Sequence, residues 1–191
     1  ILFVATKKQA KGIVAETAEA LNMPYITERW PGGLLTNFAT IRKSIKKMQT
    51  IDKMKENGTF ASLSKRERLQ IDRQRAKLDL NLGSIVKMTR MPEAIFIVDT
   101  NKEHIALAEA NKLAIRSFAM NDTNTNPSQV SFPIPANDDA SKSIECILSI
   151  VSKAIAEGLE ERNADQDKKA VEKKEKAKQI ADKAVEKQEE K

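Results

Sequence analysis

The residues best suited to chemistry form one stretch, Arg29-Trp30-Pro31-Gly32-Gly33, which leads into a basic segment. It holds the only tryptophan of the chain; Pro31 restricts its own backbone, whereas glycine can adopt conformations that other residues avoid. An arginine, an aromatic ring and unshielded backbone amides suit a phosphate backbone better than a small substrate. For Trp30, the alternative is a buried ring that anchors the turn to the core.

Charge is concentrated just after this turn. Residues 42–90 carry fourteen Lys or Arg against five Asp or Glu, in a chain of 191 residues with net charge +6. A local basic excess indicates a surface for a polyanion. The candidate contact residues are Lys7, Lys8, Arg29, Trp30, Gly32, Gly33, Asn37, Arg42, Lys43, Lys46, Lys47, Lys65, Arg66 and Arg68.

Enzyme fingerprints are missing from the sequence. No G-x-G-x-x-G follows the apolar run at residues 1–5, and no P-loop occurs. His104, the only histidine, falls near an expected helix start, which favours a surface or capping role. Asp138 and Asp139 could bind a cation, but adjacent carboxylates that open a helix usually serve its cap and dipole. We therefore expect no catalytic residue, no metal, no cofactor and no small-molecule substrate.

The elements that must position the candidate residues follow an α/β pattern. Short continuous apolar runs predict buried parallel strands, and apolar residues three or four apart predict helices between them. We expect strands at 1–5, 23–27, 94–98 and 114–120, helices at 13–21 and 105–113, a polar loop at 121–139, and then a helix capped by residues 137–140.

Two long basic helices are expected between these parts, over residues 34–56 and 65–90. Each has a narrow apolar stripe, and Ser64 with Glu67 has capping-box spacing. This pattern predicts an antiparallel coiled-coil hairpin that projects from the body. The alternative is two ordinary helices packed on the sheet.

The remaining features bound the class of protein. Cys146 is the only cysteine, so no internal disulfide can form, and its apolar neighbours predict a buried position. No apolar run reaches the roughly 20 residues that span a bilayer, and no signal peptide is visible. We expect a cytoplasmic protein without membrane contact. The chain begins inside an expected strand without Met, so earlier residues are expected to be missing.

Several motifs together resemble the family of bacterial small-subunit ribosomal protein two. They run in family order from Ile1 to about residue 160. The matching stretches are residues 1–10, 29–33, 35–38, 40–45, 77–78, 82–83, 97–99, 122–124 and 134–140. Pro31 stands where many members have Leu, and Ser84 replaces a common Gly, but both lie inside matching segments.

The resemblance implies a parallel-sheet α/β sandwich of Rossmann or flavodoxin type with an inserted antiparallel coiled-coil hairpin. Residues 1–40 and 91–160 would form the body and 41–90 the hairpin. Composition, and not the resemblance, predicts a charged, disordered or part-helical C-terminal tail at 161–191, where large apolar residues are few. The resemblance also implies contacts with small-subunit rRNA and with other small-subunit ribosomal proteins, including the large mRNA-binding ribosomal protein one. The family's N-terminal region, which usually precedes the first strand, would be absent.

Two other functions remain open at this point. A Rossmann-like nucleotide-binding enzyme would need a phosphate-binding loop after a strand, which the sequence lacks. A coiled-coil adaptor that binds only proteins would favour a charge-balanced hairpin, whereas residues 42–90 are strongly basic. The expected function is therefore a structural, rRNA-binding part of the small ribosomal subunit.

Overall fold

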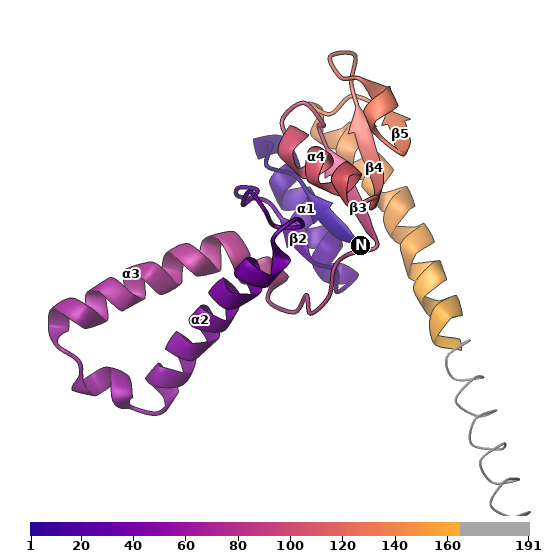
Figure 1. The fold of residues 1–191 in the computed structure, drawn as a ribbon. Coiled ribbons are helices and arrows are strands. Elements are labelled where there is room, and N and C mark those ends of the chain that lie inside the picture. Colours follow the sequence, from indigo (N-terminus) through magenta and orange to yellow (C-terminus); the bar gives the residue numbers. More distant parts are fainter. Residues whose placement is uncertain (165–191) are drawn as a thin grey trace, which may run out of the picture. The chain divides into compact units, whose positions relative to one another are not determined.

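The computed structural model describes residues 1–164, and the chain divides into two units after Ser149. The first unit contains a five-stranded sheet in which every neighbouring pair is parallel, in the order β2-β1-β3-β4-β5 (Figure 1). The strands are β1 (Leu2–Val4), β2 (Tyr25–Ile26), β3 (Ala94–Val98), β4 (Arg116–Asn121) and β5 (Phe132–Pro135). The expected parallel α/β fold is confirmed.

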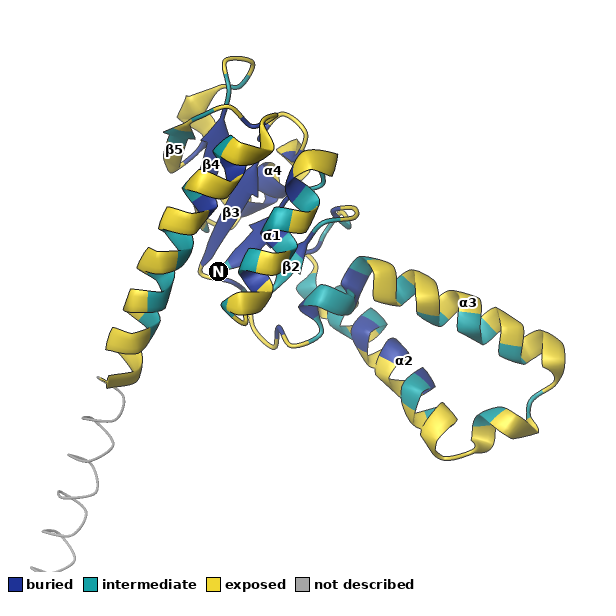
Figure 2. Ribbon diagram, turned by 180° about the vertical axis from the view of Figure 1, so that it is seen from behind, coloured by how far each residue is buried: buried dark blue, intermediate teal, exposed yellow. Residues whose placement is uncertain are grey.

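Helices connect the strands and cover the sheet. Helix α1 links β1 to β2 and α4 links β3 to β4, and the two views place these helices on opposite faces (Figures 1 and 2). The helices are α1 (Lys8–Ala20), α2 (Phe38–Glu56), α3 (Lys65–Leu82) and α4 (His104–Lys112), and residues 141–149 are also helical. Three short 3₁₀ turns lie at η1 (Thr59–Ser62), η2 (Gly83–Ile85) and η3 (Pro127–Gln129).

The central strands are buried on both faces, which explains their continuous apolar sequences. Successive side chains of a strand point to opposite faces. In β1, Leu2 and Val4 join a core cluster with Ala106 and Ala110 of α4. Phe3 points to the other face, where its ring lies 5.7 Å from that of Phe96.

Helices α2 and α3 form a pair that extends away from the sheet (Figure 1). Ion pairs join Lys55 to Asp72 at 2.6 Å and Arg75 to Asp52 at 2.7 Å, so the two helices run in opposite directions. The expected apolar stripe of α2 is buried at Ile45, Met48 and Ile51, while its other faces are exposed (Figure 2). The capping box of Ser64 and Glu67 is formed at the start of α3.

Helix α2 begins at Phe38 rather than at residue 34, and α3 ends at Leu82 rather than at residue 90. Residues 34–37 instead belong to a turn whose amides donate hydrogen bonds to a carboxylate of α4. After α3, Ile85 and Met88 are buried in the core cluster, so packing against the sheet replaces further helix. Tertiary contacts shortened both helices.

Two other expectations were wrong. The polar loop expected at 121–139 contains β5, whose Pro133 and Pro135 argued against a strand. Proline is tolerated there because β5 is an edge strand, where a missing N–H breaks no ladder. Cys146 is exposed, since Ile144 and Leu148 supply the buried side of that helix.

In the second unit, residues 150–164 are helical. The tail expected at 161–191 therefore begins inside a helix, and its remainder, residues 165–191, lies outside the described residues. None of the helices described over residues 1–164 is long and apolar enough to cross a membrane.

Candidate nucleic-acid interface

The turn that follows β2 is built around a single glycine. Gly33 has φ of +83°, a backbone conformation that side chains with a Cβ rarely adopt, whereas Gly32 has no positive φ and open space around it. The amide of Leu34 donates to the carbonyl of Pro31 at 3.0 Å and closes the turn. Of the two glycines, only Gly33 is required by the conformation.

We expect Gly33→Ala to lower the free energy of unfolding by about 1 kcal/mol or more, because alanine is strained at positive φ. The added Cβ would lie 3.4 Å from the Cβ of Asn37, an ordinary contact, so the expected loss comes from the backbone conformation. The matched change Gly32→Ala should cost less than about 0.5 kcal/mol, since nothing lies within 4 Å of the added atom. Urea unfolding of both variants tests this; equal losses would contradict the assignment.

One carboxylate of α4 binds this turn. Oε1 of Glu109 accepts hydrogen bonds from Nε1 of Trp30 at 3.0 Å and from the amide of Gly33 at 2.7 Å. Its Oε2 accepts from the amides of Leu35 at 2.9 Å and Thr36 at 3.1 Å, and from Oγ1 of Thr36 at 3.2 Å. Trp30 is 6% exposed and joins the core cluster. The geometry supports the buried-anchor alternative for its ring.

The ionisation of Glu109 is coupled to this turn. Burial acts to raise the pKa of its carboxyl group, but the hydrogen bonds from Trp30, Thr36, Gly33 and Leu35 outweigh burial and lower that pKa below its ordinary value. The charged form therefore stabilises the fold. This stabilisation is present above the ordinary glutamate pKa and is lost as the pH falls through the lowered value.

Lys7 lies just past β1, and three carboxylates hold its ammonium group. Nζ lies 3.1 Å from Oδ2 of Asp99, 2.8 Å from Oδ1 of Asp138 and 2.7 Å from Oδ1 of Asp139. Its side chain is only 15% exposed. The structure therefore argues against the expected phosphate contact at Lys7, because acids of this chain already neutralise the charge. Lys8, the next residue, is exposed.

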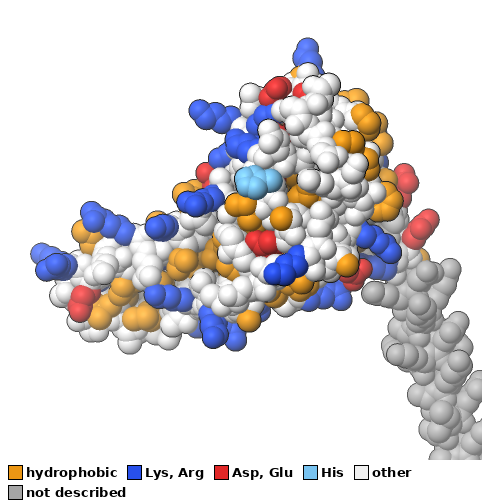
Figure 3. All heavy atoms as spheres, turned by 45° about the horizontal axis from the view of Figure 1, so that its top comes forward, with side chains coloured by type: hydrophobic (Ala, Val, Ile, Leu, Met, Phe, Trp, Pro, Cys, Tyr) orange, Lys and Arg blue, Asp and Glu red, His pale blue; other side chains and the backbone are white. Residues whose placement is uncertain are grey.

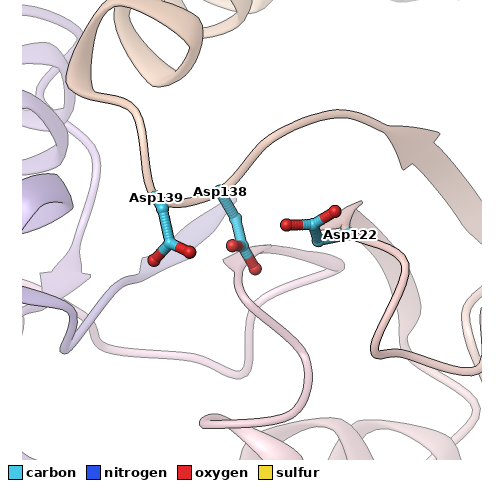
Figure 4. A group of neighbouring side chains, drawn as sticks. All are labelled: Asp122, Asp138 and Asp139. Atoms are coloured by element: carbon cyan, nitrogen blue, oxygen red, sulfur yellow. The ribbon is translucent and has the colours of Figure 1, made fainter.

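Two of these acids belong to the one candidate metal-binding group among residues 1–164, formed by Asp122, Asp138 and Asp139 (Figure 4). Their nearest ligand oxygens lie within 4.8 Å of one another, and Lys7 supplies a counter-charge beside them. The expected capping role of this segment falls on Asn137, whose Oδ1 accepts from the amides at residues 139 and 140. The adjacent aspartates bind Lys7 instead.

The expected contact residues of the helix pair divide into two groups. Lys43, Lys46 and Lys47 are exposed near the start of α2, whereas Lys65 and Arg66 are exposed at the start of α3, the opposite end of the pair. Figure 3 shows Lys and Arg side chains over this part of the surface as well as over the body. The structure therefore does not gather these residues into one compact site.

Two arginines among the predicted RNA-contact residues, Arg42 and Arg68, are not fully exposed to solvent. Nη1 of Arg42 donates to the carbonyl oxygen of Met88 at 3.0 Å, which ties the start of α2 to the segment after η2. Arg68 is half-buried. Arg42 thus has a structural contact that the sequence pattern did not reveal.

The other predicted residues lie where β1 and β2 end. Parallel strands end at the same edge of a sheet, and an ion pair of 3.0 Å between Lys11 and Glu28 joins the segments after these strands. Arg29, Gly32 and Asn37 are exposed there, as is Lys8. We use the term basic edge for five exposed cations, Lys8 and Arg29 after these strands and Lys43, Lys46 and Lys47 near the start of α2.

Sequence reasoning missed two buried acids, Glu109 of α4 and Glu103, which immediately precedes α4. Glu103 is 3% exposed and accepts hydrogen bonds from the amide of Thr6, at 3.0 Å, and from its hydroxyl. Glu109 is 8% exposed. The available signal was a carboxylate beside the buried positions Ala106 and Ala110 of a short apolar helix.

Comparisons with known proteins agree on one family. The profile described as Ribosomal protein S2 matches residues 1–158. The chain is 65% identical over 172 residues to the small ribosomal subunit protein uS2 of Flavobacterium johnsoniae, which covers 90% of this chain and 68% of that protein. It is 59% identical to uS2 of Parabacteroides distasonis, over 98% of this chain and 68% of the relative. For uS2 of Christiangramia forsetii the identity is 66%, over 86% of this chain and 55% of the relative.

Proposed function

Since the chain belongs to the ribosomal protein S2 family, we propose that it binds small-subunit rRNA through its basic edge and its helix pair. Members are structural components of the small ribosomal subunit, so the chain is a ribosomal protein and not a nucleotide-binding enzyme. Its relatives are longer, and its partners are therefore part of the proposal. Besides rRNA, we propose neighbouring small-subunit ribosomal proteins, including the large mRNA-binding ribosomal protein one.

One observation carries the rRNA proposal. The basic excess of residues 42–90 lies on a helix pair whose apolar stripe is turned inward, so its lysines face solvent. Lys43, Lys46 and Lys47 are exposed on one end of α2, next to the turn after β2. Within residues 1–164 no acid forms an ion pair with these three lysines, and closely spaced cations of this kind suit consecutive phosphates.

We also propose that the chain has a flavodoxin-like body with an inserted coiled-coil hairpin. The strand order 2-1-3-4-5 is that of flavodoxin-like doubly wound folds, which supports this assignment for residues 1–40 and 91–160. The opposed ion pairs of α2 and α3 support a coiled-coil hairpin inserted at residues 41–90. In this arrangement the body supplies Lys8 and Arg29 of the basic edge, and the hairpin supplies Lys43, Lys46 and Lys47 and lengthens the surface offered to RNA.

The experiment measures binding of a small-subunit rRNA fragment over a salt series. Changing Lys43, Lys46 and Lys47 to Gln should weaken binding roughly 10- to 100-fold and make the slope of log K against log salt less negative, because each phosphate contact contributes about −0.9 for a duplex. Arg42 is left intact because it holds Met88. Helix content should survive, since glutamine is a good helix former.

The matched control removes the same charge elsewhere on the body. Lys112, Arg116 and Lys142 are also exposed, and their change to Gln should reduce affinity much less. The loss at α2 should be similar for fragments of different base sequence, because phosphate contacts position rather than specify. Equal losses from the two triple variants would mean that only diffuse charge acts and would refute the proposed contact.

A further inference from the structure

The carboxylate of Glu109 accepts hydrogen bonds from one short segment of chain, which lies 73 to 79 residues away in sequence. Its two oxygens accept five hydrogen bonds, all from residues 30–36. An ionised carboxylate has about four lone-pair sites, so the turn uses its whole accepting capacity. The carboxylate is therefore fully committed to holding this one segment.

The segment that Glu109 holds is the connection from β2 to α2. Leu34 and Leu35 in it are buried, at 0% and 3% exposure, and α2 begins two residues after Thr36. On the return path, the contact from Arg42 to Met88 ties α2 to the chain that re-enters the sheet. Asn37, which precedes α2, makes no side-chain cap, so the side-chain hydrogen bonds that hold the entry to the helix pair come from Glu109 and, within α2, from Arg42.

We propose that Glu109 is a positioning residue for rRNA binding: it locks residues 30–36 and thereby sets the place and direction from which α2 presents Lys43, Lys46 and Lys47. This rests on the proposed function, since it assigns Glu109 a part in the same RNA contact. Glu109 itself does not touch RNA, because it is only 8% exposed and its oxygens are occupied.

The direction in which RNA affinity changes when Glu109 is neutralised distinguishes a positioning role from a purely electrostatic one. Glu109 is negative, so its neutralisation should strengthen RNA binding if only electrostatics mattered. Positioning predicts the opposite, since Glu109→Gln keeps the size of the side chain but replaces one accepting oxygen by an NH₂ group that faces N–H donors. Glu103→Gln is the matched control: this acid is also buried, but it immediately precedes α4 and binds Thr6, which follows β1.

The experiment compares the whole 191-residue chain with both variants. In Glu109→Gln, amide exchange at Leu35 and Thr36 should be at least tenfold faster, and affinity for the rRNA fragment at fixed salt should fall about tenfold despite the lost negative charge. Glu103→Gln should leave exchange at Leu35 and Thr36 unchanged and affinity equal or higher. Equal behaviour of the two variants, or unchanged exchange in Glu109→Gln, would overturn the proposal.

A milder variant covers the case in which Glu109→Gln does not fold. Thr36→Val removes only the hydroxyl donor to Glu109, at an exposed position, and should speed exchange at Leu35 and Thr36 two- to threefold with a smaller loss of affinity. Unchanged exchange and affinity would refute the proposal. If the unaltered chain fails to bind rRNA, the proposed function fails, whereas the exchange data still decide whether Glu109 locks the turn.

Discussion

Replacement of Lys7 by methionine is expected to lower the free energy of unfolding by about 3–5 kcal/mol, the largest loss we anticipate for a single charged residue. The ammonium group lies within 3.1 Å of three carboxylates, of which Asp138 is 1% and Asp99 8% exposed. Methionine fills similar space but leaves these acids close together without a counter-charge. Urea unfolding at neutral pH measures the loss.

Lys8→Met is the control for this prediction, because it makes the same chemical change at an exposed neighbour. It should alter the unfolding free energy by no more than about 0.5 kcal/mol. Comparable losses from the two variants would contradict the structural role assigned to Lys7.

The pH dependence of the Lys7 effect follows from its pKa. Burial acts to lower that pKa, but the hydrogen bonds to Asp138, Asp139 and Asp99 outweigh it and raise the pKa above the ordinary 10.5. The stabilisation is therefore complete at neutral pH and is lost only as the pH rises through the raised value. The difference between the unaltered chain and Lys7→Met should stay constant from about pH 7 to pH 9; a decline within this range would be inconsistent with a raised pKa.

Truncation of Trp30 is the second large effect, with an expected loss of about 3–5 kcal/mol for Trp30→Ala. The ring is 6% exposed in the core cluster, and its removal leaves a cavity and deprives Glu109 of one donor. Trp30→Phe retains most of the apolar contact and loses chiefly the hydrogen bond, so about 2 kcal/mol is expected. Denaturant unfolding of the two variants gives both values.

Fluorescence of the single tryptophan distinguishes the buried anchor from a ring that stacks on RNA. In the unaltered chain, acrylamide should quench the emission weakly, and saturating rRNA fragment should change it little. Trp30→Phe should lower affinity for the fragment by less than the tenfold loss expected of Glu109→Gln, because it removes only one of the five hydrogen bonds to Glu109. Strong quenching by rRNA would restore the direct contact that the sequence pattern suggested.

Much of the fold could be predicted because it depends on local patterns. The continuous apolar runs at β1 and β3 indicated strands buried on both faces, and the three-four spacing in α2 indicated which stripe faces α3. The capping box of Ser64 and Glu67 could be predicted from the sequence because both residues lie within one helical turn. β5 escaped prediction because its prolines are compatible with a strand only at a sheet edge, and the edge is defined by the other strands.

Only part of the candidate site could be predicted from the sequence. The exposed lysines of α2 could be predicted, since a residue's place relative to an apolar stripe follows from helical periodicity. Lys7, Trp30 and Arg42 were all candidates for RNA contact in the sequence, with a buried anchor as the alternative for Trp30, and each is committed to a contact within the chain.

The sequence by itself determined the parallel α/β class, the family and the segment that carries the basic charge, because composition, periodicity and motif order are properties of neighbouring residues. Only the tertiary structure decided which polar groups form hydrogen bonds or ion pairs within the chain. Lys7 meets Asp138 across 131 positions and Trp30 meets Glu109 across 79, and no local pattern encodes such pairings. Burial makes an unpaired charge or donor costly, so the fold pairs these distant groups, whereas Lys43, Lys46 and Lys47 stay exposed.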